Sequence, residues 1–431
     1  MSDGEAPAAD GEWLKGLATA LMVAVGALLV AMLLRIGPVQ CPNDASRWDT
    51  VWSLVERGTY VIDEAPWADT IDKVKRGEHF YSSKPALLPT MVAGEYWLLK
   101  KLTPWNLKDN TEPVVRIILL TVNALPLAVC IWLFASFLTR HVESQWWAAF
   151  WLVAAALGTY VTGYCVTFTN HTVGAFSALF GLYATVRIVY DGERRARFFI
   201  LAGVFGAFTA CNELPAGLYA LALFVWLLAC DRRRTLMWFL PAAALVAAAY
   251  LLTTYLSTGG FLPYYVYKNT ELYLYEGSYW REPVGIDAAA EPKWLYTLHA
   301  IVGHHGIFSL SPIFVLSAVG VGLNLRKGKG RLRALNLLAV GMTVAILAVY
   351  VATTNNYGGV CRGLRWMFWL APLWLFTGAL GADGYGKSRI VKALGLAFLF
   401  VSISSMAEAL GSPWGWSWLH EIIRGLGWVG Y

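Results

Sequence analysis

The residues best suited to chemistry lie in one polar stretch, residues 41–89. Asp44 and Arg47 are three residues apart near its start, and Lys84 lies near its end in the run Tyr-Ser-Ser-Lys-Pro. A carboxylate can accept or position a proton, whereas an arginine and a lysine can neutralise a phosphate. If the chain brings them together, these three residue types predict a site that handles a phosphate group.

Asp44 and Arg47 also have a purely structural interpretation. Apolar residues follow them at the helical spacing i, i+3, i+4 and i+7, namely Trp48, Val51, Trp52 and Val55. This spacing predicts a helix that begins near Asn43 and turns its apolar face to lipid. Asp44 would then be the N-cap and Arg47 a surface partner. The spacing alone favours this structural interpretation.

Lys84 can likewise be structural. We expect Lys84 and Pro85 to begin the next helix, because proline is common at the first helical position and Ser82 or Ser83 can cap it. A lone lysine at such a place usually extends along the membrane surface until its charge reaches water.

The elements that position these residues are membrane helices. The chain has 431 residues, of which 57% are hydrophobic and only 14% charged, against about 25% charged in soluble domains. The hydrophobic residues come in long blocks, which indicates helices rather than a barrel. The net charge of +6 is modest and predicts no nucleic-acid partner. The six scattered cysteines predict neither a zinc site nor a disulfide framework.

Eleven apolar blocks have the character of membrane spans. They are residues 13–36, 113–138, 146–164, 172–190, 198–211, 214–230, 235–256, 304–325, 332–353, 364–382 and 390–409. The prediction is therefore an all-α, polytopic membrane helix bundle that forms one domain over residues 1–431. Residues 37–112 form a first outer loop with juxtamembrane helices, and residues 257–303 form a second large outer loop.

Basic residues set the orientation, because they concentrate in cytoplasmic loops. They cluster in alternate loops, near residues 140, 194–197, 232–234, 326–333 and 387–389. Placing these loops inside puts the N-terminus in the cytoplasm and the C-terminus outside. The polar stretch is then outside only if the apolar helix over residues 85–99 does not cross. We therefore expect that helix to be juxtamembrane or re-entrant.

Two short motifs of the polar stretch resemble a known family. The run Asp-Ala-Ser-Arg-Trp from Asp44, followed by Tyr-Ser-Ser-Lys-Pro-Ala-Leu-Leu-Pro from Tyr81, is similar to the first outer loop of GT-C glycosyltransferases. These are membrane enzymes that use polyprenyl-phosphate-linked sugars. The nearest branch holds the lipid A aminoarabinose transferases and the protein O-mannosyltransferases, with the motifs D-E-x-R-Y and Y-x-x-K-P-P-L.

The resemblance implies a role for each charged residue. Asp44 matches the catalytic aspartate, Arg47 the motif arginine, and Lys84 the lysine that contacts the lipid phosphate. The chain departs from the motifs by having Ala45 in place of glutamate, tryptophan in place of the motif tyrosine, and Ala86 in place of the second proline. These changes spare the charged atoms.

Two later segments resemble uncharacterised bacterial members of the same family. Residues 355–366 are similar to their W-W-G-G…G-P-R-Y loop and contain Arg362 and Arg365, which could help to bind the donor phosphate. Residues 303–312 are similar to an R-G-L-F-F-x-S-P segment, with histidine in the arginine place. His304 and His305 are thus candidates for substrate binding.

Further substrate-binding candidates come from the outer turns. Many GT-C enzymes have a second acidic residue in the second outer loop, where this chain offers Asn170 and His171 instead. These two could bind sugar hydroxyls or simply cap the next span. Glu213 is a carboxylate near the membrane, which is often functional, although a turn would let it reach water. Tyr81 and the tyrosines of residues 257–303 could contact a sugar or form an interfacial aromatic belt.

Together these features predict an enzyme that transfers a sugar from a polyprenyl-phosphate-linked donor to a lipid, glycan or protein acceptor. Its location would be the inner membrane, among membrane lipids, with the active site on the periplasmic face. No metal and no other cofactor is predicted, because only Asp44 can be placed at the centre, whereas Asp49 should point away from it. The alternative is a non-enzymatic lipid-phosphate binder or flippase.

Overall fold

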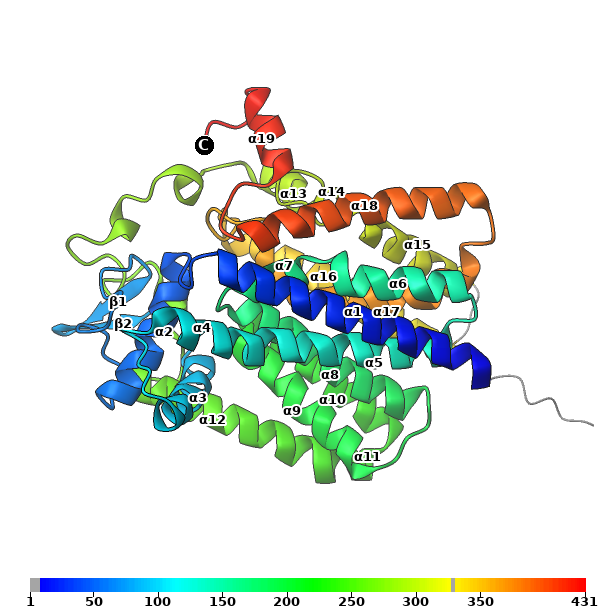
Figure 1. Ribbon diagram of the computed structural model, residues 1–431, viewed down its shortest axis with the longest axis horizontal. Coiled ribbons are helices and arrows are strands. Elements are labelled where there is room, and N and C mark those ends of the chain that lie inside the picture. The colour runs from blue at the N-terminus through cyan, green and yellow to red at the C-terminus, as the bar shows by residue number, and fades with distance from the viewer. Residues whose placement is uncertain (1–7, 327–329) are drawn as a thin grey trace, which may run out of the picture.

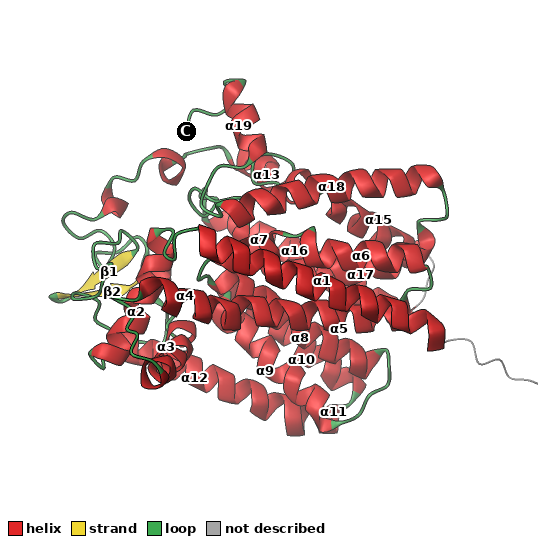
Figure 2. Ribbon diagram, viewed as in Figure 1, coloured by secondary structure: helices red, strands yellow, loops and turns green. Residues whose placement is uncertain are grey.

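The computed structural model describes residues 8–326 and 330–431. Long helices run roughly side by side, and one end of the bundle carries a polar cap (Figures 1 and 2). The bundle helices are α1 (Ala8–Arg35), α4 (Thr111–Leu119), η1 (Leu120–Ala124), α5 (Leu125–His141), α6 (Gln145–Leu157), α8 (Asn170–Val189), α9 (Ala196–Asn212), α10 (Gly217–Cys230), α12 (Leu240–Thr258), α15 (Ile313–Arg326), α16 (Gly330–Thr353), α17 (Ala371–Gly381) and α18 (Arg389–Gly411). Helices thus occupy all eleven segments that the sequence predicts as spans.

Not all of these helices have full spanning length. Within the described residues, seven helical segments are long and apolar enough to cross a membrane. The helices α9, α10 and α15 are apolar but shorter. These apolar helices confirm a polytopic helical membrane protein. In lipid, a helix satisfies the hydrogen bonds of its own backbone, which water cannot do there.

The helix α8 lies at the centre of the bundle and is mostly buried. It packs closely along α9, because Gly181 faces Gly206: a Cβ on Gly181 would stand 3.3 Å from the Gly206 nitrogen. Small residues of this kind let membrane helices approach each other. The first residues of α8 are Asn170 and His171, so the most buried of the seven spanning segments presents them to the polar cap.

The polar cap is built by residues 37–112. It contains α2 (Pro42–Glu56), the antiparallel hairpin of β1 (Lys73–Arg76) and β2 (His79–Ser82), and α3 (Leu87–Leu102). The hairpin was not predicted; its turn contains Gly77 at φ 61°, a left-handed conformation that suits glycine. The helix α3 packs on α2 at the capped end rather than running along the bundle (Figure 1), as expected for a juxtamembrane helix.

The predicted helix after Cys41 is present, but its apolar face was misassigned. Cys41 is the N-cap, its sulfur accepting from the Asp44 backbone N–H, so the expectation that Asp44 caps the helix is wrong. Trp48 and Val51 are fully buried inside the protein, with Trp48 against the ring of Phe168. The apolar stripe of α2 therefore packs on the bundle and not on lipid.

The start of α3 also differs from the prediction. The helix begins at Leu87, after Pro85, and its N-cap residue Ala86 makes no capping side-chain bond. Ser82 does accept a hydrogen bond from the Lys84 backbone N–H at 3.2 Å, but it does so in the turn that precedes the helix. Lys84 is thus in the link between β2 and α3, where its side chain is free to turn inward.

The second large outer loop, residues 257–303, closes over the hairpin. The Lys75 N–H donates to the Leu272 carbonyl at 2.9 Å, and the Trp280 indole N–H donates to the Ile71 carbonyl at 3.1 Å. Val74 packs with Tyr264 and Tyr273. Several of the loop tyrosines are therefore packed against protein instead of forming a lipid-facing belt.

The basic end of the bundle lies opposite the cap. The short helix α11 (Arg232–Arg234) is at that end, where α1 also begins (Figure 1). There Asp191 pairs with Arg140 at 2.9 Å and with Arg187 at 2.8 Å. Lys327 and Lys329 of the predicted basic cluster lie outside the described residues.

Candidate functional site

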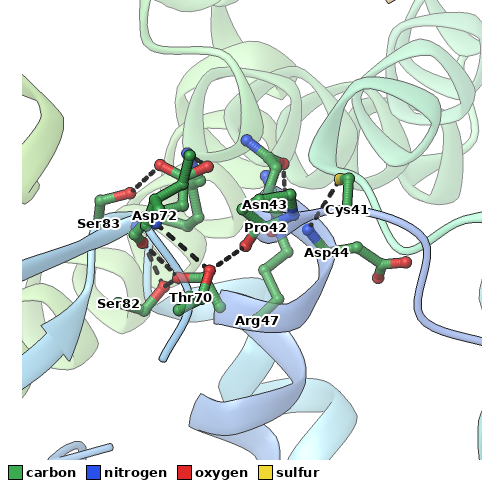
Figure 3. Close-up of polar contacts among 12 residues, drawn as sticks. Cys41, Pro42, Asn43, Asp44, Arg47, Thr70, Asp72, Ser82 and Ser83 are labelled. Carbon is green, nitrogen blue, oxygen red and sulfur yellow. Dashed lines mark hydrogen bonds and ion pairs between the residues drawn. The ribbon is translucent and has the colours of Figure 1, made fainter. Parts of the chain in front are cut away.

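The sequence-predicted charges meet where α2 approaches the first turn of α8 and the loop after β2. Figure 3 shows Asp44 and Asp72 on opposite sides of the first turn of α2, with Arg47 below them. The charged groups thus form one site with three parts: Asp44 on one side, a lysine–aspartate pair on the other, and Arg47 leading toward α8.

Arg47 is buried, with 2% of its surface exposed. Its guanidinium donates to the Asn43 carbonyl at 2.8 Å, to the Asn43 side chain and to the Asn170 side-chain oxygen. Burial and, to a smaller extent, the nearby Arg365 lower the pKa of Arg47 to about 10. The expectation of a surface residue is therefore wrong. Arg47 instead links the start of α2 to the start of α8.

Asp44 is fully buried. Its carboxylate accepts hydrogen bonds from the Gln40 N–H at 3.2 Å, the Thr167 hydroxyl at 3.1 Å and the Phe168 N–H at 3.3 Å. Burial raises the pKa of Asp44 to about 7, although these hydrogen bonds and Arg47 oppose the rise. A carboxyl with a pKa near neutrality can exchange a proton at physiological pH. The residue also ties the first outer loop to the second.

Lys84 forms an ion pair that the sequence analysis missed. Its ammonium lies 2.7 Å from Asp72 Oδ2, and the Ser83 hydroxyl donates to Asp72 Oδ1 at 3.0 Å. The Ser46 hydroxyl donates to the Asp72 carbonyl at 2.7 Å. Burial lowers the pKa of Lys84 to about 8, while Asp72 opposes the fall. Burial would raise the pKa of Asp72, but Lys84 holds it below its usual range.

One signal in the sequence could have located Asp72. The run Lys-Val-Lys-Arg and the run His-Phe-Tyr-Ser flank a short turn that contains Gly77, and β1 pairs with β2 so that Lys73 faces Ser82. Extending that register by one residue places Asp72 opposite Ser83, directly before Lys84. Recognising the hairpin would therefore have brought Asp72 to the lysine.

Four more of the predicted residues converge at the start of α8. Asn170 donates to Glu213 Oε1 at 3.1 Å, and His171 Nδ1 is bonded to the same carboxylate. The other nitrogen of His171, Nε2, lies 2.9 Å from the guanidinium of Arg365. Arg365 itself begins η8 (Arg365–Leu370) and also donates to the Gly358 carbonyl at 2.7 Å.

Two expectations for this region are corrected. The N-cap of α8 is Thr169, so neither Asn170 nor His171 caps the helix. Glu213 is buried and bonded to both of them, so the turn after α9 does not expose it to water. A second carboxylate thus lies on the Arg47 side of the site, although it comes from the α9–α10 turn and not from the second outer loop.

Other predicted residues lie elsewhere. Tyr81 packs on Tyr264 of the second large outer loop, with ring centroids 5.8 Å apart. Arg362 pairs with Glu408 at 2.6 Å, away from Arg47. His304 and His305 belong to a separate cluster of histidines, where His305 Nε2 is 3.9 Å from the Cys361 sulfur.

Asp49 is also turned away from the centre, as expected. Its carboxylate accepts from the Trp67 N–H at 2.9 Å. Among the described residues, the one group of three metal-ligating side chains within reach of one another is Glu291, His299 and His304. That group lies outside the Asp44 site.

The site holds three cations at one end of the bundle. Arg47, Lys84 and Arg365 come from three separate segments, and their mutual repulsion lowers the pKa of Lys84 in addition to burial. Each cation has a protein partner, so the arrangement is satisfied. An anion that binds between them would be held by charge-assisted hydrogen bonds, and arginine suits the planar oxygens of a phosphate.

The comparisons with known proteins identify a solved structure with a similar fold. No family model matches the chain, and no curated protein matches it. Its structure is similar to that of an oligosaccharyltransferase from Archaeoglobus fulgidus, solved with a tethered acceptor peptide that contains the NVT sequon. The TM-score is 0.51 at 14% sequence identity, over 93% of this chain and 55% of the other.

This likeness confirms the predicted GT-C type of membrane fold. The chain spans about half the length of that oligosaccharyltransferase. The branch indicated by the first-loop motifs stays a prediction. The chain has the fold of a GT-C membrane protein.

Proposed function

We propose that the chain is a glycosyltransferase that moves a sugar from a polyprenyl-phosphate-linked donor to an acceptor hydroxyl or phosphate. The observation that carries the proposal is the convergence of Arg47, Lys84 and Arg365 at one end of a GT-C-type bundle. Three cations repel each other, and a bound phosphate relieves that repulsion. A phosphate held at this level would leave its lipid tail among the helices.

The proposed reaction uses these groups in a defined way. With a hydroxyl acceptor, its oxygen forms a bond to the anomeric carbon while the bond from that carbon to the phosphate oxygen breaks. The polyprenyl phosphate leaves with the bonding electrons, and Arg47 and Lys84 stabilise its charge. Asp44 takes the acceptor proton, a role that its pKa of about 7 supports.

The enclosed position of Asp44 adds a requirement. Its carboxylate is covered by Thr167 and Phe168 of the second outer loop, the segment that directly precedes α8. An acceptor can reach it only when this loop parts from the link between α1 and α2. In the proposed enzyme, acceptor binding therefore includes a movement of the second outer loop.

The proposed location is the inner membrane, with the N-terminus in the cytoplasm and the site on the periplasmic face. Support comes from the basic helix α11, which lies at the opposite end from the cap (Figure 1), since basic loops favour the cytoplasm. A polyprenyl-phosphate flippase is the second candidate. It would need polar groups across the membrane midplane, whereas the charges of this site gather at one end.

The test is turnover in detergent, where no membrane separates two sides. Purified protein should release polyprenyl phosphate from a polyprenyl-phosphate sugar as an acceptor gains the sugar. Lys84→Ala should lower kcat/KM by roughly 10² to 10³-fold. Arg47→Lys should also lower it, because an ammonium cannot replace the two-pronged guanidinium.

The matched control is Lys100→Ala. Lys100 is also a lysine in an ion pair within the first outer loop, with Glu56, but its own side chain is exposed. Its loss should leave turnover unchanged. Full turnover by folded Lys84→Ala would refute the phosphate assignment, and binding without any release of polyprenyl phosphate would favour the flippase.

A further inference from the structure

A second cluster of chemically active side chains lies beside the cap, outside the Asp44 site. It involves Glu291 of the second large outer loop, His299 in α13 (Lys293–Ile301) and His304 in the turn that follows. One ligand atom from each lies within 4.8 Å of the others. No part of the proposed sugar transfer uses these residues.

His304 is held as a ligand histidine usually is. Its Nδ1 is hydrogen-bonded to His305 Nδ1, and this contact leaves Nε2 to face the Tyr431 hydroxyl at 3.1 Å. Histidines that bind metals commonly engage the other ring nitrogen in a hydrogen bond, which fixes the tautomer and the ring orientation. His305 is thus placed as an outer-shell partner of His304.

Glu291 faces the same point from the other side. The Tyr431 hydroxyl donates to Glu291 Oε1 at 2.7 Å, so this phenol bridges Glu291 and His304. The Tyr357 hydroxyl donates to Glu291 Oε2. The carboxylate is oriented by two phenols, and one of its oxygens lies on the histidine side.

His299 is the member that nothing else explains. It is 6% exposed, and its Nδ1 is buried with no hydrogen-bond partner among the described residues. Its ring stacks on His304 with centroids 4.1 Å apart. Buried polar atoms without a partner are rare in folded proteins and call for a cause. A bound ion would give this imidazole a partner.

We propose that Glu291, His299 and His304 bind one Zn²⁺ ion. Two imidazoles and one carboxylate form a set that zinc favours, whereas Mg²⁺ and Ca²⁺ prefer oxygen ligands alone. Tyr431 or a water completes four-coordination. Ligand atoms around tetrahedral zinc stand about 3.3 Å apart, so binding draws the ligand atoms, which now lie within 4.8 Å of one another, together by up to about 1.5 Å.

The ion would stabilise the loop that carries Arg365. Besides the Tyr357 contact, Lys293 donates to the Thr354 carbonyl at 3.0 Å. The loop from Thr354 to Arg365 is therefore joined to the metal-binding segment at two points. The zinc site is a structural site in this proposal, and it stands whether or not the chain transfers a sugar.

The experiment measures metal binding directly. Purified full-length protein, free of affinity tag and stripped with EDTA, is titrated with Co²⁺, whose visible absorption reports tetrahedral nitrogen and oxygen ligation. One equivalent should bind, and one equivalent of Zn²⁺ should displace it. Glu291→Gln and His299→Ala should abolish the Co²⁺ spectrum, whereas His305→Phe should lower the affinity roughly 10- to 100-fold.

The matched control is His79→Ala, which removes an exposed histidine paired with Asp63 on the hairpin. It should bind Co²⁺ as the unchanged protein does. If His299→Ala does not fold, as judged by size-exclusion chromatography, the Co²⁺ spectrum of Glu291→Gln tests the zinc site, because this substitution keeps the side-chain shape. No Co²⁺ spectrum in the unchanged protein, or an equal spectrum in folded Glu291→Gln, would overturn the zinc site.

Discussion

At the scale of single residues, Asp44 is the residue whose substitution should best separate donor binding from turnover. Its carboxylate contacts Gln40, Thr167 and Phe168 rather than any of the cations. Donor binding should therefore rest on Arg47 and Lys84, and the role of Asp44 should be confined to the acceptor proton.

We expect Asp44→Asn to lower turnover by roughly 10² to 10⁴-fold, because the amide cannot accept a proton. Donor binding should stay within about twofold, since the cations are untouched. An equilibrium binding measurement beside a turnover assay checks both. A similar loss of donor affinity would mean that Asp44 contacts the donor.

The carboxylates of the site also predict its metal dependence. Within residues 8–326 and 330–431, the carboxylates that join Asp44 in the site are Asp72 and Glu213, and each already has a partner. Three cations are available to neutralise a phosphate, so no divalent ion is needed there. Protein treated with EDTA and resupplied with Zn²⁺ alone should keep its turnover. A requirement for added Mg²⁺ or Mn²⁺ would show that the carboxylates act together as a metal site.

The pKa values of Asp44 and Lys84 predict how the activity depends on pH. Asp44 must be ionised to accept a proton, and its pKa of about 7 means that activity rises with pH through that value. Lys84 must be protonated to bind phosphate, and its pKa of about 8 means that activity falls above that value. A plot of kcat/KM against pH should therefore be bell-shaped, with its maximum between about 7 and 8.

This profile can be assigned by mutation. Lys84→Arg keeps a cation that stays charged well above pH 8, so the falling limb should move to higher pH. The rising limb should remain. If both limbs stay in place, a group other than Lys84 controls the upper limit.

At the scale of elements, the position of α3 predicts on which side of the membrane the cap lies. The helix packs on α2 at one end of the bundle (Figure 1). Cysteines introduced at Asp69, before α3, and at Lys108, after it, should therefore react with an impermeant thiol reagent from the same side of the membrane. Labelling from opposite faces would show that α3 crosses.

The native Cys230 provides the internal reference for this experiment. It is exposed at the end of α10, next to the basic α11, and should react from the side opposite to both new cysteines. A variant in which Cys230 is the one remaining cysteine serves as the positive control for labelling. A variant in which Cys230 is replaced as well gives the background signal.

The elements also show what the sequence could predict. The spacing of Trp48, Val51 and Trp52 correctly predicted α2, because a 3.6-residue period reports a helix with one apolar face. The period does not report what covers that face. In the structure Phe168, from a segment 120 residues away, covers Trp48, and only the folded chain brings that segment there.

At the scale of the whole molecule, the fold was the most predictable feature. Long apolar blocks can do little in lipid except form helices, so the spans follow from composition. The site was less predictable, because its contacts join residues far apart in the chain, such as Arg47 with Asn170 and His171 with Arg365. Charged residues at outer turns could be named, but their partners depend on how the helices pack.

The missed residue illustrates the same limit. Asp72 is one of several carboxylates in the polar stretch, and nothing in its own neighbours distinguishes it from Asp63 or Asp69. Its role depends on the pairing of β1 with β2 and on Ser46, which holds its backbone from α2. A site residue of this kind becomes visible only when the register of the hairpin is known.

The π-helical turn η1 has a consequence for how the gene can change. It interrupts the long helix formed by α4 and α5, and it turns Asn123 so that its amide binds the carbonyls of Cys165 and Thr167, each at 3.0 Å. A π-turn contains one residue more than the α-turn it replaces. Loss of a single codon at positions 120–124 would thus restore an ordinary spanning helix while releasing the loop that covers Asp44. An in-frame deletion of one residue in this stretch would therefore keep the membrane helices but remove the contacts that hold the site together.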